Sequence, residues 1–350
     1  MYDISVVMPT ARSDYSIIGQ PDLHFLKPTI RSLADQEFKD FEFIVVDALH
    51  GSRGYDFSKL PFDVKHVPVH PNHRFWLDHK RWGVAGTLNT GIIHAEGELI
   101  VRVDDCSQFG PDFLRRFWDG YESGVWPMAM HIRYLGGEPA VFNDEYRKVG
   151  YEAKYSEMVS EEKRFNVLGR IYGEGGIVKD TRFELVRGAG GRLIAPVNWM
   201  YGYSSFTTRA AVKVNGFDEL FDGDKSLEDV DFGSRLVMAG YTDLFQLDIE
   251  HTVIEHEHMP LPESVVAKDL KNIKCNYALY LLNRRKGRWR TNDNILNEED
   301  LAYIKKESLV SPCDPDPERS IYEDGCEGEL FRLWADNQPD FDLRDERLDV

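Results

Sequence analysis

Apolar segments separated by amphipathic ones dominate the first hundred residues of the chain. Four segments have the length and apolar content of buried strands: residues 4–8, 41–46, 64–69 and 99–103. Between them, residues 26–36 and 83–94 place apolar side chains at helical spacing. This alternation of strand and helix predicts an α/β fold in which helices cover a mainly parallel sheet.

Polar residues follow three of these predicted strands at the point where each strand ends. Thr10 follows the first strand, Asp47 the second, and the pair Asp104 and Asp105 the fourth. The carboxyl ends of parallel strands lie along one edge of a sheet, and ligands bind there. An acidic turn before a helix near Pro111 would also explain the paired acids, which repel each other unless a cation or a donor lies against them. The convergence of three strand ends favours a binding site.

A second group of acids opens a predicted helix that runs to Gly240. Glu228, Asp229 and Asp231 all fall in its first turn, where exposed backbone N–H groups favour negative charge. Helix capping is therefore one interpretation of this group. Three carboxylates within four residues exceed the need of a cap, and a carboxylate held there suits a general base that deprotonates an alcohol.

Two further features lie near this second acidic group. His256 and His258 stand two apart in a predicted extended segment, so both imidazoles can share one face and form a candidate metal site. Trp199 precedes the acidic group and has two interpretations, stacking on a sugar acceptor or packing in the core.

The remainder of the chain is less regular. Glycines recur at 173–176 and 188–191, and the pattern fits either loops that close over a ligand or turns between strands. Neither run matches a dinucleotide or Walker fingerprint. The composition changes near Pro260, where a predicted helix at 265–285 leads into a basic run at 284–290 and then an acidic tail. The basic run is typical of a solvated helix end, although it could also meet an anionic acceptor.

Composition and charge limit the classes of partner. The 350 residues carry a formal net charge of −18, from 60 acids and 42 bases, which disfavours duplex DNA as a ligand. The four cysteines lack the spacing of a zinc site or a disulfide framework. Asp3 stands where a signal peptide would carry positive charge, and no apolar run reaches the ~18 residues of a transmembrane helix. We therefore expect a cytosolic (cytoplasmic) protein without a transmembrane segment.

The motifs, taken in order, resemble those of family-two glycosyltransferases with the GT-A fold. The matching segments share their order and spacing with that family over about residues 1–260: 6–10, 44–47, 88–92, 95–98, 104–105, 215–219 and 228–231. The resemblance implies a Rossmann-like mixed sheet flanked by helices in residues 1–260, followed by a mainly helical and acidic extension in residues 261–350. It also implies inverting transfer of a sugar from a nucleotide-diphosphate donor, expected to be UDP-linked, to a hydroxyl of a glycan or other acceptor.

The resemblance also implies roles for residues on the donor side. Asp47 matches the position that holds the nucleotide base, and Pro9 with Thr10 matches the floor beneath the nucleoside. Asp104 and Asp105 match the Asp-x-Asp element that binds the ribose and a divalent metal, Mn²⁺ or Mg²⁺. The usual last acid of that element is Cys106 here, so Asp105 is the preferred metal ligand and the choice of metal is left open.

On the acceptor side, the resemblance assigns Asp229 as catalytic base and Glu228 as an orienting or acceptor-binding group. His256 or His258 falls where several members place a further metal ligand. Two alternatives stay open. A nucleotide-sugar-binding module could have lost turnover through Cys106, although a pure binder needs no base. Nucleotidyl transfer is disfavoured because residues 11–15 lack the expected glycines.

Overall fold

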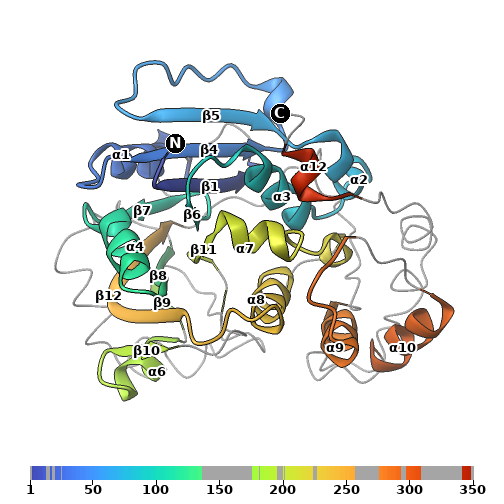
Figure 1. Cartoon of the computed structure of the whole chain (residues 1–350). Coiled ribbons are helices and arrows are strands. Elements are labelled where there is room, and N and C mark those ends of the chain that lie inside the picture. The colour runs from blue at the N-terminus through green and yellow to red at the C-terminus, as the bar shows by residue number, and fades with distance from the viewer. Residues whose placement is uncertain are drawn as a thin grey trace.

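The protein is an α/β molecule whose computed structural model describes most of the first 135 residues and separate stretches of the remainder (Figure 1). The described residues are 2–12, 16–17, 20–24, 26–135, 176–180, 182–194, 200, 202–223, 227–256, 276–292, 297–308 and 341–347.

A five-stranded sheet forms the centre of the fold. Its order is β11 (Ser205–Thr207), β6 (Leu99–Arg102), β1 (Ile4–Thr10), β4 (Phe41–Asp47) and β5 (Asp63–Pro68). The last four strands run parallel to one another, whereas β11 is antiparallel to β6. The four predicted strands are thus all present, in the parallel arrangement that their spacing indicated.

Helices cover both faces of this sheet. On one face, α3 (Val84–His94) packs Leu88 and Ile92 against Val7. A Cβ on Gly91 would lie 2.3 Å from Val7 Cγ1, so this glycine lets the helix approach the strand closely. On the other face, α1 (Lys27–Ala34) and α4 (Phe113–Glu122) enclose the alternate side chains of β1, including Val6. The predicted α/β class, a mixed sheet flanked by helices, is confirmed.

A second sheet lies beside the first and was not foreseen. It orders β10 (Arg192–Ile194), β12 (Phe245–His256), β8 (Trp126–Leu135) and β9 (Gly176–Lys179), and β7 (Ser107–Phe109) also pairs with β12. The run at 188–191 forms the turn from α6 (Arg182–Gly188) into β10, with φ of +85° at Gly190 and +101° at Gly191. These glycines therefore form a turn, but it joins a helix to a strand rather than two strands. Residues 173–175 lie outside the described residues.

The described part of the C-terminal extension packs directly against the rest of the chain. Helix α9 (Asn276–Lys286) shares an apolar cluster with Trp76 and Phe221, and α12 (Leu343–Glu346) lies beside α3 (Figure 1). The predicted helix at 265–285 is present from Asn276 onward, and its earlier part lies outside the described residues. Among the described helices, none combines the length and the apolar composition that crossing a membrane would require.

The remaining elements are short or carry site residues. They are β2 (Ser16–Ile17), β3 (Gln20–His24), η1 (His50–Ser52), η2 (Pro71–His73), α2 (Phe75–Asp78), α7 (Thr208–Lys213), η6 (Glu219–Phe221), α8 (Glu228–Met238) and α10 (Glu298–Ser308).

Candidate functional site

The carboxyl ends of β1 and β6 bring Thr10 and Asp105 into contact. The hydroxyl of Thr10 donates to Asp105 Oδ2 at 2.9 Å, and Arg12 Nε lies 3.2 Å from the same oxygen. Asp105 is only 9% exposed, because both groups cover it. Pro9 is half-buried in β1, opposite Val46 of β4. Thr10 and Asp105 therefore lie together where the strands end, and Arg12 is an addition that the sequence did not indicate.

A buried arginine joins the two acidic groups that are far apart in the sequence. Arg102, the last residue of β6, is 6% exposed. Its Nη2 lies 3.7 Å from Asp104 Oδ1 and 4.0 Å from Glu228 Oε1, and its Nη1 lies 3.5 Å from Asp229 Oδ2. The acids after β6 and those at the start of α8 therefore lie close together, on either side of Arg102.

The environment of Asp229 raises the pKa of its carboxyl to about 7. Burial is the main cause, and the neighbouring Glu228 adds to it. Arg102 opposes this effect, as does the Val230 N–H, which donates to Asp229 Oδ1 at 2.8 Å. Asp229 therefore changes charge near neutral pH, as a general base requires.

The pKa of the Asp104 carboxyl is also raised. Burial raises the pKa of its carboxyl, and the nearby Glu255 and Asp105 raise it further, whereas Arg102 and His131 lower it. Its side chain is 35% exposed, which leaves it more open to solvent than its neighbour Asp105. Asp104 is thus the more accessible of the paired acids.

The second sheet supplies further polar residues behind Asp104. His131 on β8 places Nδ1 3.5 Å from Asp180 Oδ2 and Nε2 3.9 Å from Glu255 Oε2. Asp180 also pairs with Arg182 at 2.6 Å. Burial raises the pKa of Asp180, but the charges of Arg182 and His131 lower it by more, to about 2. Sequence reasoning missed His131 because its strand was not predicted, and it passed over Glu255 between the apolar Ile254 and the predicted ligand His256.

These acids offer the type of donor that a divalent cation takes, although in this structure they are not drawn together into a group of three ligands. Asp105 pairs with Arg12, Asp104, Glu228 and Asp229 lie around Arg102, and Glu255 acts on the charge of Asp104. Carboxylate oxygens are the ligands that Mg²⁺ and Mn²⁺ prefer. Arg102 Nε and Nη1 are buried and have no hydrogen-bond partner among the described residues, and such N–H groups suit an anion rather than a cation.

Asp47 lies in register with Thr10, as predicted, but it is closed off from solvent. Its Oδ1 accepts from the Leu49 N–H at 2.8 Å, and its Oδ2 lies 2.8 Å from Arg53 Nε and 2.9 Å from His66 Nε2. The carboxylate is 0% exposed. Its predicted role in holding a nucleotide base stays a prediction, and in this conformation Asp47 anchors the loop after β4.

Several sequence-based assignments fall at or beyond the limits of the described residues. Trp199 and His258 lie outside them, and His256 is the last residue of β12, of which only the backbone is described. Cys106 is wholly buried in the apolar cluster beneath β1 and has a positive φ of 62°. Its thiol thus packs in the core, and the acids that reach the site are Asp104 and Asp105.

Two of the motif segments, 88–92 and 215–219, contact each other. The amide of Asn89 on α3 donates to the Phe217 carbonyl and to Glu219 Oε1, both at 2.9 Å. A Cβ on Gly216, which has a φ of +72°, would lie 2.2 Å from Asn89 Oδ1. The segment at 215–219 is therefore packed tightly against α3.

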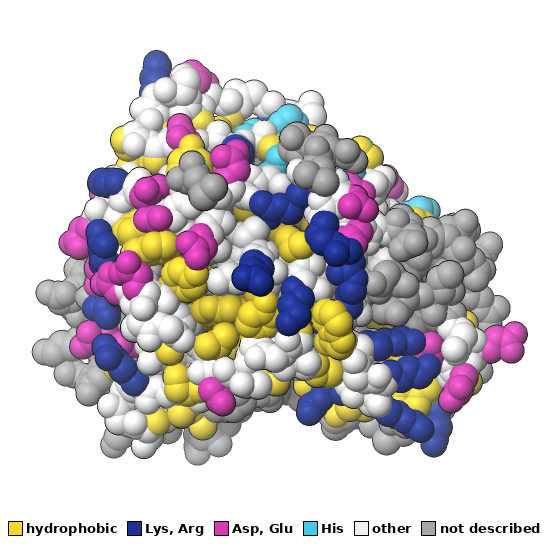
Figure 2. Space-filling model, viewed as in Figure 1, with side chains coloured by type: hydrophobic (Ala, Val, Ile, Leu, Met, Phe, Trp, Pro, Cys, Tyr) yellow, Lys and Arg dark blue, Asp and Glu magenta, His cyan; other side chains and the backbone are white. Residues whose placement is uncertain are grey.

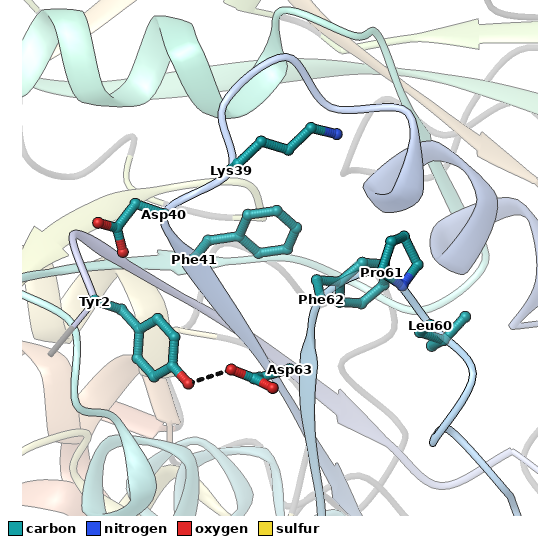
Figure 3. Close-up of a pocket in the computed structure, with 8 residues that line it drawn as sticks. All are labelled: Tyr2, Lys39, Asp40, Phe41, Leu60, Pro61, Phe62 and Asp63. Atoms are coloured by element: carbon teal, nitrogen blue, oxygen red, sulfur yellow. Dashed lines mark hydrogen bonds between the residues drawn. The ribbon is translucent and has the colours of Figure 1, made fainter.

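A pocket of about 640 Å³ lies at the opposite edge of the central sheet, away from these acids. Figure 3 shows Tyr2, Phe41 and Phe62 around it, at the amino ends of β1, β4 and β5. The Tyr2 hydroxyl donates to Asp63 Oδ2 at 2.5 Å, and this bond is the main cause that raises the pKa of Tyr2 to about 12. None of the predicted site residues lines this pocket.

The basic run at 284–290 is largely engaged within the protein. Figure 2 shows Lys and Arg side chains gathered over α9 and α10. Lys286 and Arg288 both pair with Asp300, and Arg290 pairs with Asp342 at 2.9 Å. These pairs tie α9 to α10 and to the C-terminal segment, which supports the interpretation as a helix end over that as an acceptor site.

Comparison with known proteins adds a distant structural likeness. No protein-family model matches the chain, and the curated proteins contain no match. Among solved structures, the chain is similar to S. aureus TarS 1–349 in complex with UDP-GlcNAc, with 14% identity, a TM-score of 0.43, and coverage of 87% of this chain and 71% of that one. S. aureus TarS 1–349 alone gives 14% identity, a TM-score of 0.41 and coverage of 88% and 82%. S. aureus TarS gives 15% identity, a TM-score of 0.39 and coverage of 99% and 54%.

Proposed function

We propose that this protein is an inverting glycosyltransferase that moves a sugar from a nucleotide-diphosphate donor, most simply a UDP-sugar, to an acceptor hydroxyl. The observation that carries the proposal is the position of Arg102 between Asp104 and Asp229. It brings acids that could hold a divalent cation for the donor diphosphate, and an acid suited to proton removal, into one place. A likeness at 14% identity does not assign an activity, so the proposal rests on these side chains.

Asp229 serves as the general base in this proposal. The acceptor oxygen forms a bond to the anomeric carbon while the bond from that carbon to the diphosphate breaks, and the leaving diphosphate keeps the electron pair. Asp229 takes the proton of the acceptor hydroxyl, which its pKa of about 7 permits near neutral pH. Attack on the face opposite the leaving group inverts the anomeric configuration. Glu228 maintains the raised pKa of Asp229 and orients the acceptor.

Thr10, Pro9 and the paired acids form the donor side. Asp105 is held by Thr10 and Arg12, which suits a fixed contact to the ribose, and the more exposed Asp104 suits a metal ligand beside the predicted ligand Asp105. A bound Mn²⁺ or Mg²⁺ supplies positive charge that stabilises the leaving diphosphate. The proposal also includes three roles that the sequence predicts. His256 or His258 is a further metal ligand, Asp47 holds the nucleotide base, and Trp199 stacks on the acceptor.

A thermal-shift screen of nucleotide sugars, with and without Mn²⁺, tests this function. Ligands that bind only the folded protein raise its melting temperature, so we expect a UDP-sugar to do so in the presence of Mn²⁺. Asp104→Asn and Asp105→Asn should abolish the shift. Asp63→Asn, in the pocket at the opposite edge, is the matched control and should preserve it.

Turnover separates an enzyme from a binding module. The stabilising donor should release UDP slowly with water as acceptor, and faster once an acceptor is present. Donor binding without any UDP release would support the alternative of a nucleotide-sugar-binding module, and a screen without a single stabilising nucleotide sugar would reject both.

A further inference from the structure

Two histidines and a glutamate from distant parts of the sequence meet away from the candidate site. His70 precedes the 3₁₀ turn η2, His73 is the last residue of that turn, and Glu346 lies on α12. One ligand atom from each residue can be chosen so that all three lie within 4.8 Å of one another. His70 Nε2 is 3.4 Å from Glu346 Oε2. Imidazole nitrogens and a carboxylate oxygen are the usual ligands of Zn²⁺.

One ring nitrogen in this cluster has no hydrogen-bond partner. His73 is 3% exposed, and its Nε2 is buried without a partner among the residues that the structure describes. Its other nitrogen, Nδ1, lies 2.5 Å from Glu219 Oε1. A carboxylate that accepts the Nδ1 proton leaves the Nε2 lone pair available and orients the ring, which is the usual arrangement behind a zinc-bound histidine.

The three residues are held on fixed supports. The His70 N–H donates to Thr90 Oγ1 on α3 at 3.1 Å, and a Cβ on Gly86 of α3 would lie 2.5 Å from the His73 carbonyl oxygen. On the other side, Asn72 Nδ2 donates to Glu346 Oε1 at 3.0 Å. Glu219 is itself fixed, because Asn89 Nδ2 donates to its Oε1. The backbone on both sides of the cluster is therefore constrained before any ion binds.

We propose that His70, His73 and Glu346 form a zinc site that fastens the C-terminal helix α12 to the loop between β5 and α3. The site is separate from the acids around Arg102 and does not rest on the proposed transferase activity. Zinc ligands at the usual bond lengths stand about 3.4 Å apart, so the three side chains draw together by roughly an ångström when the ion binds. A water molecule would complete four-coordination.

Binding also has an identifiable cost within the cluster. His70 Nδ1 accepts from the Asn72 N–H at 3.3 Å, the longest hydrogen bond of the group. Coordination through His70 Nε2 would place the ring proton on Nδ1 and give up that bond. His73 meets no such conflict, because its Nδ1 already faces Glu219.

Zinc titration of the full chain, with any affinity tag removed, tests the proposal. The chain is stripped with a chelator, and Zn²⁺ binding is followed by competition with a colorimetric chelator and by the shift in melting temperature. We expect one zinc ion per chain at this site and a higher melting temperature in its presence. Co²⁺ should give the visible absorption of a tetrahedral site.

Variants assign the zinc to these residues. Glu346→Gln keeps the shape of a partly exposed side chain and should remove tight zinc binding, whereas Glu219→Gln should weaken it by roughly 10–100-fold, as is typical for a partner behind a ligand. Asp345→Asn, on the exposed side of α12, is the matched control and should bind zinc like the wild type. Asp105→Asn should also retain this zinc. The absence of zinc binding by the wild type, or unchanged binding by Glu346→Gln, overturns the proposal.

Discussion

Replacing Asp229 by Asn should make the protein more stable and nearly inactive. The folded environment raises the pKa of Asp229 from 3.8 to about 7, mainly through burial and secondly through Glu228. Each pH unit of such a difference corresponds to about 1.4 kcal/mol, which gives about 4 kcal/mol. The side chain is 15% exposed, and screening by that solvent reduces the expected effect to about 2–4 kcal/mol.

The sign of this effect depends on pH. Below about pH 3 the Asp229 carboxyl is protonated in both the folded and the unfolded chain, so Asp229→Asn should match the wild type in stability. As the pH rises toward about 7, the unfolded chain releases the proton first, and the free energy of unfolding of the wild type falls. The neutral Asn is free of this penalty, so the difference between the two proteins should grow to its full value by about pH 8.

Urea denaturation at pH 4.5 and pH 8 measures the change in the free energy of unfolding. The rate of UDP release from the stabilising donor measures the change in activity. Loss of the base should lower kcat by about 10²–10⁴-fold while the donor dissociation constant stays unchanged. Asp119→Asn, a carboxylate on the surface of α4 that is 60% exposed, serves as control and should change neither property. An Asp229→Asn protein that is less stable than the wild type at pH 8, or that keeps most of its kcat, would refute this reasoning.

Three further predictions concern Glu228 and Arg102 at the candidate site and Gly91 in the packing of α3. Glu228→Gln removes a charge that raises the pKa of Asp229, so the acidic limb of kcat/KM against pH should move to lower pH, and an unmoved limb would show that Glu228 does not act on the base. Arg102→Met leaves three acids without their shared cation, so its melting temperature should fall further below the wild type at pH 8 than at pH 5, and a deficit independent of pH would contradict the electrostatic role. Gly91→Ala should destabilise the fold by about 1–3 kcal/mol through overpacking, because the added Cβ would lie 2.3 Å from Val7 Cγ1. Gly51→Ala is the control and should be tolerated, because nothing lies within 4 Å of its added Cβ. Equal urea midpoints for the two variants would count against close packing of α3.

The sequence was sufficient to predict β1, β4 and β6 because these strands are short, apolar and almost wholly buried. It also predicted β5, which is only partly buried, but not the edge strand β11. The position of Thr10, Asp47 and Asp105 then followed from the parallel order, since the ends of such strands share an edge. The proximity of Thr10 and Asp105 follows from that order, whereas the hydrogen bond between them was not predicted.

Arg102 and the second sheet could not be predicted in the same way. Arg102 falls inside an apolar segment, so the pattern counts it as part of a strand and predicts no role for it. A buried arginine nevertheless almost always has charged partners. Strand β8 pairs with β12, more than a hundred residues later in the chain, and neither strand has a clear alternation of its own. Likewise, the closure of Asp47 by Arg53 and His66 depends on a loop conformation that the strand pattern does not encode.

A crystal structure of the chain with UDP and Mn²⁺ tests the central claim most directly. The account predicts an anomalous manganese peak within bonding distance of Asp104 or Asp105, the diphosphate beside it, and open space for an acceptor next to Asp229. UDP bound in the pocket near Tyr2, or manganese away from both acids, would contradict it.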